Sequence, residues 1–269
     1  MRIAAVTGAG SGIGRGICLA LARRGYVVAA ADISETGVLA TAELVQKAGG
    51  TCTTRRVDVT KADEVAEWAR QIRAEHGDVS VIVNNAGVSV TGLFDSTSQD
   101  DFEWLFAVNW WGVVYGARAF LPQLRASAAA GRPAHLVNVS SIFGIVGMPS
   151  QTAYCASKAA VRGFTETLQS ELHGTGVTAH CVHPGAVATR IAEDARYTVD
   201  VGPISPSRAR KLIARGLSPD LAGEYIVAQM EAGRERILVG RDAGLLDRLQ
   251  RWFPTGYRAI VRHGARYLR

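Results

Sequence analysis

The 269-residue chain contains few cysteines, and their spacing suggests neither a disulfide framework nor a metal site. The four are scattered along the chain without a CxxC pair: Cys18, Cys52, Cys155 and Cys181. Such scarcity favours a reducing, intracellular compartment. We therefore expect a cytoplasmic protein that holds no metal ion.

Long apolar runs are also missing. The longest uncharged stretch, residues 136–157, contains Asn, Ser, Thr, Gln and Pro, which are uncommon together in a membrane-spanning helix. The opening residues MRIAAVTG reach a glycine too early for a secretory signal peptide. The sequence thus predicts neither a membrane span nor a secretory leader.

Acidic residues are scarce near the C-terminal end. Residues 244–269 hold six arginines against a single aspartate, Asp247, so this segment carries +5 of the net charge of +6. The preceding 243 residues are close to neutral, which gives little support to nucleic-acid binding. We expect a main domain over residues 1–243 and a basic extension over residues 244–269.

The main domain alternates short apolar runs with segments of helical spacing. The runs are RIAAVT, YVVAAAD, TCTTRRVDV, VSVIVNNAG, AHLVNVSS, VTAHCVHPG and RILVG. The helical segments between them include residues 12–24, 36–47, 61–76, 100–125 and 152–173. Because apolar runs without polar alternation are buried on both faces, they indicate parallel strands. The alternation predicts an α/β fold with one doubly wound parallel sheet flanked by helices.

A glycine-rich turn, TGAGSGIG at residues 7–14, follows the first strand and opens the first helix. Glycines there let backbone amides approach a pyrophosphate at the helix N-terminus. About 20 positions further on, Asp32 ends the next strand, where its carboxylate suits the adenosine ribose hydroxyls and repels a 2′-phosphate. We expect Arg15 to point along the helix and leave that repulsion in place. The pattern favours NAD(H) over NADP(H).

The segment YCASK places Tyr154 and Lys158 on the same side of a helix, with their Cβ atoms about 5–6 Å apart. Taken alone, such a pair is most often an ordinary feature of a helix surface. A free tyrosine has a pKa near 10, which suits a general base poorly at neutral pH. A neighbouring ammonium, together with a cationic nicotinamide ring, would favour the phenolate and lower that pKa. The pair could therefore tune a phenol for proton transfer.

The ordered set of motifs resembles the classical short-chain dehydrogenase/reductase family. Gly8, Gly12 and Gly14 have the spacing of that family, NNAG follows the fourth strand, NVSS ends the fifth, and HPG follows the sixth. Asn109 lies in AVNWWG. The resemblance extends over nearly the whole chain. It implies a single Rossmann-type domain with about seven parallel strands, and a substrate lid near residues 190–216.

The same resemblance implies the catalytic roles. Ser141 lies thirteen residues before Tyr154 and would hold and polarise the substrate oxygen, whereas the spacing fits Ser140 less well. Lys158 would also bind the nicotinamide ribose, and Asn109 would anchor a water that links Lys158 to solvent. The implied catalytic set is Asn109, Ser141, Tyr154 and Lys158.

Cofactor contacts carry over by position. Asp58 would accept a hydrogen bond from the adenine amino group, and Val187 and Thr189 would meet the nicotinamide carboxamide. Thr189 is also suited to cap the helix that follows it. The implied cofactor-binding set is Gly8, Ser11, Gly12, Ile13, Gly14, Asp32, Asp58, Val59, Asn85, Ala86, Gly87, Tyr154, Lys158, Pro184, Gly185, Val187 and Thr189.

These patterns predict an NAD-dependent oxidoreductase that interconverts an apolar secondary alcohol and its ketone, as a homodimer or homotetramer. The expected pocket lining is apolar: Val88, Val90, Phe143, Ile145, Val146 and Met148, with Tyr197, Val199, Val201 and Ile204 of the lid. One alternative is an NADP-dependent carbonyl or 3-oxoacyl reductase. Another is a non-catalytic nucleotide sensor on the same fold, for which we would expect an interrupted Ser–Tyr–Lys set.

Several conspicuous side chains have a simpler interpretation. We expect His183 to be a packed loop residue, Cys155 to lie in the core, and Trp110 and Trp111 to serve packing or a subunit contact. In the extension, bulky apolar residues recur at helical spacing among arginines: Leu245, Leu246, Leu249, Trp252 and Phe253. Such a stripe can pack on the protein or lie on an anionic membrane surface. Packing is the preferred interpretation, because an exposed patch of this size is unfavourable in water.

Overall fold

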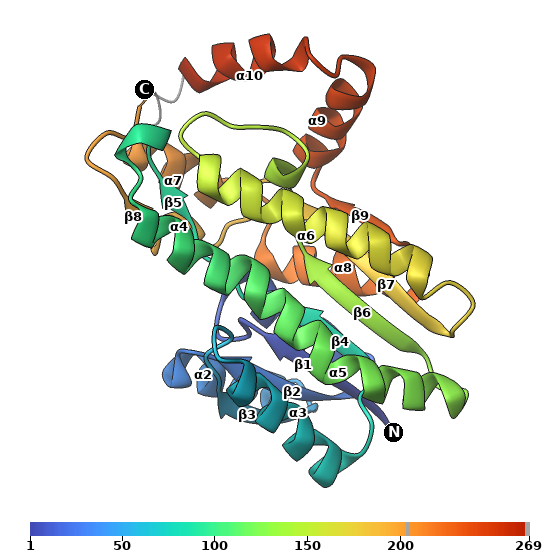
Figure 1. Ribbon diagram of the computed structural model, residues 1–269. Helices are drawn as coiled ribbons and strands as arrows, with labels where there is room; N and C mark the ends of the chain where they lie inside the picture. The colour runs from blue at the N-terminus through green and yellow to red at the C-terminus, as the bar shows by residue number, and fades with distance from the viewer. Residues whose placement is uncertain (203–204, 267–269) are drawn as a thin grey trace.

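Seven parallel strands form one twisted sheet at the centre of the molecule (Figure 1). The computed structural model describes residues 1–202 and 205–266. The strands lie side by side in the order β3-β2-β1-β4-β6-β7-β9. Their bounds are β1 Arg2–Thr7, β2 Tyr26–Asp32, β3 Thr51–Arg56, β4 Val81–Asn84, β6 Ala134–Val139, β7 Val177–Pro184 and β9 Arg236–Val239. The predicted α/β architecture, with a parallel sheet of about seven strands, is confirmed.

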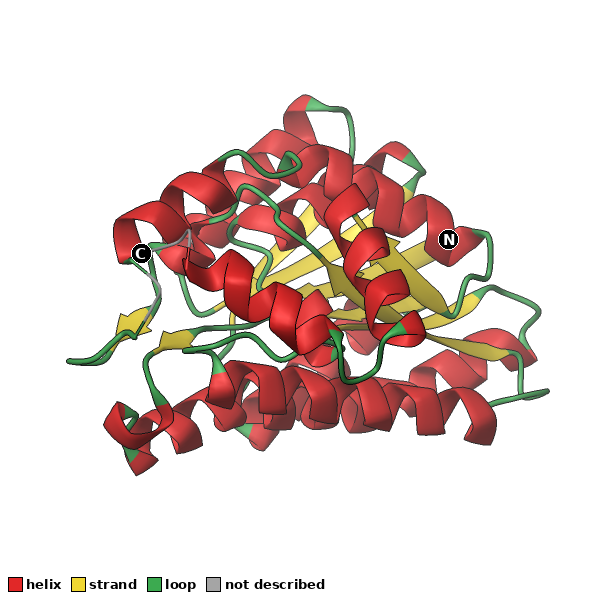
Figure 2. Cartoon of the chain, turned by 90° about the horizontal axis from the view of Figure 1, so that it is seen from above, coloured by secondary structure: helices red, strands yellow, loops and turns green. Residues whose placement is uncertain are grey.

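Helices cover both faces of the sheet (Figure 2). They are α1 (Gly12–Arg23), α2 (Glu35–Lys47) and α8 (Pro219–Glu231) on one face, and α3 (Ala62–His76), α5 (Gly112–Ala129) and α6 (Thr152–Glu171) on the other. Successive side chains of β1 serve opposite faces, as the two-residue period of a strand requires. Ala4 and Val6 belong to the first apolar cluster, and Ile3 and Ala5 to the second.

The long helix predicted over residues 100–125 is divided into three segments. They are α4 (Gln99–Phe106), a π-helical segment at Ala107–Trp111, and α5. π-Helical turns inside helices are rare and are frequent at functional sites. This one carries Asn109, so the irregularity falls on a residue of the implied catalytic set.

Smaller elements lie outside the main sheet. A two-stranded parallel sheet pairs β5 (Val90–Thr91) with β8 (Arg196–Tyr197). The short helix α7 (Pro206–Ala214) follows β8 along the chain. These elements bring part of the expected lid beside the segment that follows β4.

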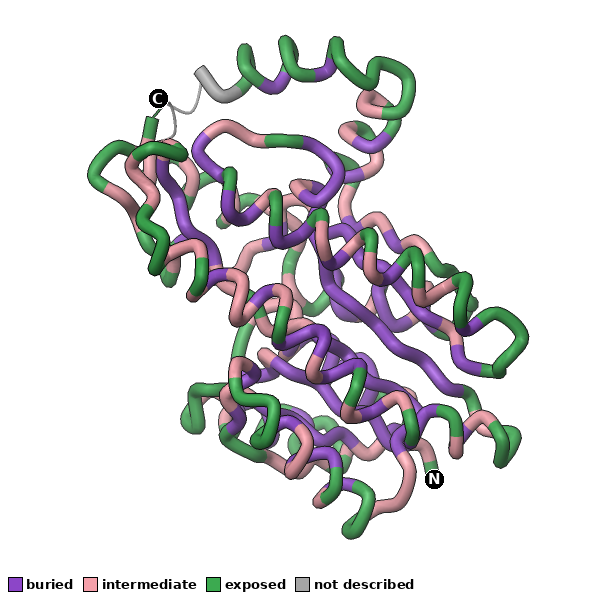
Figure 3. The backbone as a smooth tube through the Cα atoms, viewed as in Figure 1, coloured by how far each residue is buried: buried purple, intermediate pink, exposed green. Residues whose placement is uncertain are grey.

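The C-terminal extension lies in α9 (Arg241–Trp252), which begins three residues before the expected start of the extension at residue 244, and in α10 (Tyr257–Arg266), at the top of Figure 1. One side of these helices packs on the loop between β6 and α6. Ala243, Tyr257 and Val261 are buried there against Ile142 and Val146. Figure 3 shows that the opposite side of both helices is largely exposed. Within the described residues, no helix is long and apolar enough to cross a membrane.

Candidate active site

The predicted motifs meet at the carboxyl ends of the strands. Thr7, Asp32, Asn84, Val139 and Pro184 each end a strand of the main sheet. The strand order reverses between β1 and β4, since β2 and β3 lie on one side of that pair and β6, β7 and β9 on the other. In open α/β sheets, ligands bind in the crevice at such a switch point.

The glycine-rich turn forms a close-packed cradle at the start of α1. Gly8 and Gly12 have positive φ values of 63° and 52°, which glycine adopts without strain. A Cβ atom at Gly14 would lie 2.1 Å from the Gly8 carbonyl oxygen, so no side chain fits there. Ser11 caps α1 without a side-chain hydrogen bond to the first-turn amides. Those amides therefore suit the pyrophosphate of a dinucleotide.

Asn85 supports this cradle from the end of β4. Its side-chain amide donates hydrogen bonds to the carbonyl oxygens of Thr7, at 3.0 Å, and Gly8, at 3.1 Å. The backbone amide of Asn85 also donates to the Thr7 hydroxyl, at 3.0 Å. The side chain of Asn85 therefore holds the loop, a role that the sequence did not reveal.

Asp32 is held at the rim of the cradle by two backbone amides. Its carboxylate accepts hydrogen bonds from Gly10, at 2.8 Å, and Ser34, at 2.9 Å. The prediction for Arg15 is wrong, because its guanidinium turns back to the Gly10 carbonyl and to the Thr41 hydroxyl, at 3.0 Å. A cation therefore lies near the loop, although no ion pair joins it to Asp32 in the described part of the chain.

Asp58 and Val59, two other residues of the implied cofactor-binding set, follow β3 and make their contacts with other parts of the chain. Asp58 does not end the third strand, since β3 stops at Arg56. Its carboxylate accepts from the backbone amide and the hydroxyl of Thr60, at 2.9 and 2.8 Å, which stabilises a turn. Val59 packs against Gly112.

The segment after β7 approaches the glycine-rich turn from the other side. A Cβ atom added to Gly12 would lie 3.0 Å from the Thr189 methyl group, so the two segments are in close contact. Thr189 precedes a 3-10 turn at Arg190–Ala192, but its side chain makes no capping hydrogen bond. Val187 is buried. This segment therefore closes one side of the cradle.

The Tyr–Lys pair lies in the first turns of α6, and both side chains are buried. Tyr154 is 8% exposed and Lys158 is 3% exposed. The Lys158 ammonium donates to the Val139 carbonyl, at 3.0 Å, and lies 5.8 Å from the centre of the Tyr154 ring. Phe143 packs edge-on against that ring, with 6.3 Å between the ring centres. Burial on this scale is incompatible with the interpretation as an ordinary surface pair.

The two candidate serines have different partners. Ser141 forms a hydrogen bond with the Tyr154 hydroxyl, and its own hydroxyl oxygen accepts from the Phe143 amide, at 3.1 Å. Ser140 donates to the Lys158 carbonyl, at 2.7 Å, and so supports α6 from beneath. The structure therefore brings Ser141, and not Ser140, to the phenol.

His183 is fully buried, as a packing residue would be, but it also contacts the site. Its Nδ1–H donates to the Ser141 carbonyl, at 3.2 Å. Burial lowers the pKa of His183 to about 4, so the ring is neutral at pH 7. The contact orients the backbone of Ser141. Nothing in the sequence around HPG signals this partner, which follows the neighbouring strand β6.

Asn109 is fully buried within the π-helical segment and clamps the chain after β4. Its side chain accepts from the Val88 amide, at 2.8 Å, and donates to the Val88 carbonyl, at 3.0 Å. It also donates to the Ser157 hydroxyl, at 3.2 Å. A Cβ atom at Gly87 would lie 3.3 Å from both the Asn109 amide oxygen and the Lys158 ammonium. The four predicted catalytic residues thus belong to one connected group.

Burial dominates the protonation of this group. It raises the pKa of Tyr154 to about 12, although the hydrogen bond from Ser141 acts in the opposite direction. It lowers the pKa of Lys158 to about 8. The sequence suggested a lowered pKa for the phenol, but desolvation by the protein outweighs its other neighbours. The phenol is therefore a proton donor at neutral pH until a further positive charge approaches it.

The expected apolar pocket is divided between two parts of the molecule. Val88, Val90 and Phe143 gather around Tyr154, as predicted. Ile145 and Val146 do not line this pocket, because they pack in the cluster that contains α9 and α10. Met148 packs with the same cluster and lines a groove beneath α10.

Among the lid residues that were expected to line the pocket, those that the structure describes do not share one environment. The Tyr197 hydroxyl donates to the Ala192 carbonyl, and Val201 is half-buried. Val199 is fully exposed, so it does not line a pocket in this conformation. Ile204 lies outside the described residues.

Three other side chains complete the account of the predicted residues. Cys155 is not in the core: it is half-buried, lines the groove beneath α10 and accepts from the Met148 amide, at 3.5 Å. Trp110 packs edge-on against Phe164, with ring centres 5.4 Å apart. Trp111 stacks on Tyr115 and remains 44% exposed.

A doubly wound sheet with a dinucleotide cradle at its switch point defines the class of Rossmann-type α/β proteins. Within this class, residues 2–200 match the family described as short chain dehydrogenase. The chain belongs to the short chain dehydrogenase family, and it is an oxidoreductase of that family.

Known relatives extend the similarity beyond the matched segment. SadH of Mycobacterium tuberculosis, which carries the provisional name of an oxidoreductase, is 38% identical over 98% of this chain and 95% of its own length. A short chain dehydrogenase/reductase from Burkholderia phymatum in complex with NAD superposes with a TM-score of 0.87, covers 94% of each chain and is 29% identical. An alcohol dehydrogenase from Thermococcus sibiricus, complexed with 5-hydroxy-NADP, gives a TM-score of 0.75 at 27% identity and covers 89% of this chain and 96% of its own.

Proposed function

We propose that the protein is an NAD-dependent oxidoreductase that interconverts an apolar secondary alcohol and its ketone. The observation that carries this proposal is the buried group of Ser141, Tyr154 and Lys158 beside the dinucleotide cradle. A nicotinamide cofactor, when bound, supplies the acceptor or the donor of hydride. The residues of the chain then have to hold the substrate oxygen and move one proton.

Each residue of the group suits one part of that task. In ketone reduction, the carbonyl carbon gains a hydride and the oxygen gains the Tyr154 proton, which yields the alcohol. The Ser141 hydroxyl donates a hydrogen bond to the same oxygen and stabilises its developing negative charge. The Lys158 ammonium lies close enough to the Tyr154 ring to stabilise the resulting phenolate. Alcohol oxidation reverses these transfers.

The apolar residues around Tyr154 support an apolar substrate. Val88, Val90 and Phe143 gather there, with Phe102 and Ile191 packed against the same cluster. None of these side chains offers a charge or a hydrogen bond to a polar substrate group. We therefore propose that Ser141 and Tyr154 supply the polar recognition and that the rest of the substrate is hydrophobic.

Asp32 supports NAD over NADP. Its carboxylate is held by the amides of Gly10 and Ser34, so it cannot turn away from a 2′-phosphate without breaking those bonds. The position of Arg15 favours the alternative, an NADP-dependent carbonyl reductase, because its guanidinium lies beside Gly10. However, Arg15 is already held by the Gly10 carbonyl and Thr41. A non-catalytic sensor is disfavoured by the intact Ser–Tyr–Lys group.

Cofactor preference and substrate class can be tested together. We expect kcat/KM to be higher with NAD(H) than with NADP(H) across a panel of secondary alcohols and ketones of increasing chain length. Asp32→Asn keeps the shape and one acceptor oxygen but removes the charge, so it should narrow the preference. Asp63→Asn, which removes an exposed carboxylate in the first turn of α3, is the matched control. Equal use of both cofactors by the unmodified protein would contradict the NAD assignment.

A further inference from the structure

The two C-terminal helices have an outer surface that the rest of the chain leaves uncovered. We define it as the tail face, by its exposed apolar residues Leu245, Trp252, Phe253 and Ile260 and the arginines Arg258 and Arg262. The four apolar side chains are 68%, 76%, 55% and 55% exposed. Exposed apolar groups of this size close together commonly mark an interaction site.

The apolar residues of the tail are sorted between two sides. Tyr257 and Val261 pack inward, one helical turn apart, and Leu246 and Leu249 of α9 pack against the same cluster. Ile260, which lies between Tyr257 and Val261 in the sequence, is exposed. The predicted packing of the stripe on the protein therefore holds for Leu246 and Leu249. It is wrong for Leu245, Trp252 and Phe253, whose exposure needs a different explanation.

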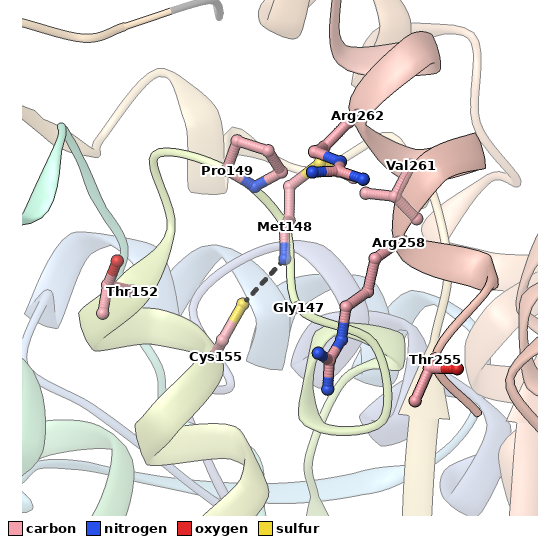
Figure 4. A pocket seen from close by; sticks show the side chains of 9 residues that line it. All are labelled: Gly147, Met148, Pro149, Thr152, Cys155, Thr255, Arg258, Val261 and Arg262. Carbon is pink, nitrogen blue, oxygen red and sulfur yellow. Dashed lines mark hydrogen bonds between the residues drawn. The ribbon is translucent and has the colours of Figure 1, made fainter.

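Arg258 and Arg262 lie one turn apart on α10 and border a groove of about 600 Å³ (Figure 4). The opposite wall consists of residues 147–149 with Thr152 and Cys155. No carboxylate lines this groove, and neither guanidinium has an ion pair within the described residues. Two unpaired guanidinium groups at the mouth of a groove are suited to phosphate oxygens.

The acidic residues of α9 do not offset this charge, because both point toward the protein. Asp247 is 5% exposed and pairs with Arg236 and Arg251, the latter at 3.1 Å. Asp242 accepts a hydrogen bond from the Ala186 amide, at 2.6 Å. The exposed apolar side chains of the tail are therefore accompanied by exposed arginines at the edge of the groove, and neither carboxylate of α9 neutralises these arginines.

We propose that the tail face docks on a membrane surface that contains anionic phospholipids. The apolar side chains would enter the boundary between headgroups and acyl chains, and the arginines would bind headgroup phosphates. Trp252 is well suited to this boundary, because its ring is apolar and its indole N–H is a donor. Charge complementarity selects this partner.

A second copy of the chain fits this surface less well. In a two-fold dimer the same patch meets itself. The arginines of both protomers would then share one interface, without carboxylates of the tail to neutralise them. An anionic bilayer would instead attract these arginines through its headgroup phosphates.

Vesicle co-sedimentation of the full-length protein tests the proposal. The probe is phosphatidylcholine vesicles with and without phosphatidylglycerol, at low and at physiological salt. We expect binding that requires phosphatidylglycerol and weakens with salt, since screening reduces the attraction. Arg258→Gln with Arg262→Gln should weaken binding on the order of 30-fold, at about a factor of five for each arginine near the surface.

Two further variants separate charge from apolar contact. Trp252→Ser with Phe253→Ser should also reduce vesicle binding while retaining the charge. Arg70→Gln with Arg73→Gln, on the exposed side of α3, removes the same charge elsewhere and should leave binding close to that of the parent. All of the changed side chains are exposed, so melting temperatures should stay close to the parent value.

The proposal has clear opposing outcomes. It is overturned if the intact protein does not bind phosphatidylglycerol vesicles at low salt, or if the α3 and α10 variants lose binding equally. It is also overturned if light scattering without lipid shows a dimer that Trp252→Ser with Phe253→Ser dissociates, because a second copy would then cover the face. If the double serine variant melts early, Leu245→Gln replaces it as the test of apolar contact.

Discussion

Helices α6 and α10 present their positive charges in opposite ways. Lys158 of α6 is buried beside Tyr154 and bonds to a carbonyl oxygen of the sheet, whereas Arg258 and Arg262 of α10 are exposed at the edge of a groove. The first charge is desolvated, so its pKa falls to about 8 and it influences groups within the protein. The other two remain in water and can attract a partner from outside. The difference in burial therefore suits Lys158 to a role inside the site, and Arg258 and Arg262 to contact with a partner.

The largest effect on activity is expected for the buried group in α6. Tyr154→Phe removes the hydroxyl that donates the proton, and it should lower kcat by roughly 10²–10⁴-fold, the usual contribution of positioned acid–base catalysis. Nucleotide affinity, measured by fluorescence titration with NADH, should change little, because the cradle is untouched. Steady-state activity within a few-fold of the parent would contradict the assignment.

Buried histidines should make the folded protein sensitive to acid. Burial lowers the pKa values of His135, His180 and His183 to about 4, below the ordinary value of 6.5. Between these values the unfolded state binds more protons, so stability is complete above pH 6.5 and falls as the pH drops toward 4. Each site alone would contribute a loss of about 3 kcal/mol at most.

Denaturant unfolding at intervals between pH 7.5 and 4 measures this loss. His183→Gln removes one of the three titrating groups and should flatten the profile, even if it lowers stability at pH 7. The His135 ring donates to the His180 ring, at 3.0 Å, so these two are expected to titrate as a pair. A stability that does not change over this pH range would argue against neutral buried rings.

Alanine substitutions at two glycines compare the close packing of the cradle with an open position in a helix. Gly14→Ala places a methyl group on the Gly8 carbonyl, and such overpacking typically costs about 1–3 kcal/mol. It should also raise the Kd for NADH. The control is Gly163→Ala in the middle of α6, where an added Cβ meets nothing within 4 Å. That change should stabilise the protein by about 0.5–1 kcal/mol, and equal effects of the two variants would refute the cradle geometry.

The smallest effects should distinguish the two sides of α10. Val261→Ala removes buried methyl groups from the cluster under the tail and should cost about 1–2 kcal/mol. Its neighbour Ile260 is 55% exposed, so Ile260→Ala should change stability by less than about 0.5 kcal/mol. Thermal unfolding of both variants makes the comparison. A larger loss for Ile260→Ala would mean that the outer side of α10 is covered in solution.

Much of the fold follows from local pattern. Apolar runs mark the buried strands of the main sheet, because a strand buried on both faces needs apolar residues at nearly every position. The edge strand β3, with the sequence TCTTRR, is polar and largely unburied, so it lacks this signal. Gly8 and Gly14 indicate the cradle in the sequence. Gly8 has a positive φ that other residues rarely adopt, and Gly14 lies too close to the Gly8 carbonyl to carry a side chain. The four residues of the implied catalytic group were named through the resemblance to the short-chain dehydrogenase/reductase family, and the structure places them together.

Other features depend on which segments meet, and local pattern does not carry that information. Ile145 and Val146 have the same apolar character as Val88, yet they pack under α9 and α10 and not around Tyr154. The contact of Arg15 with Thr41 and the contact of His183 with Ser141 join residues that are distant in sequence. The raised pKa of Tyr154 has the same origin, because desolvation is a property of the surrounding fold. The motifs and the resemblance that they carry were therefore enough to propose which residues form the chemical group, and the tertiary packing set their charges, partners and exposure.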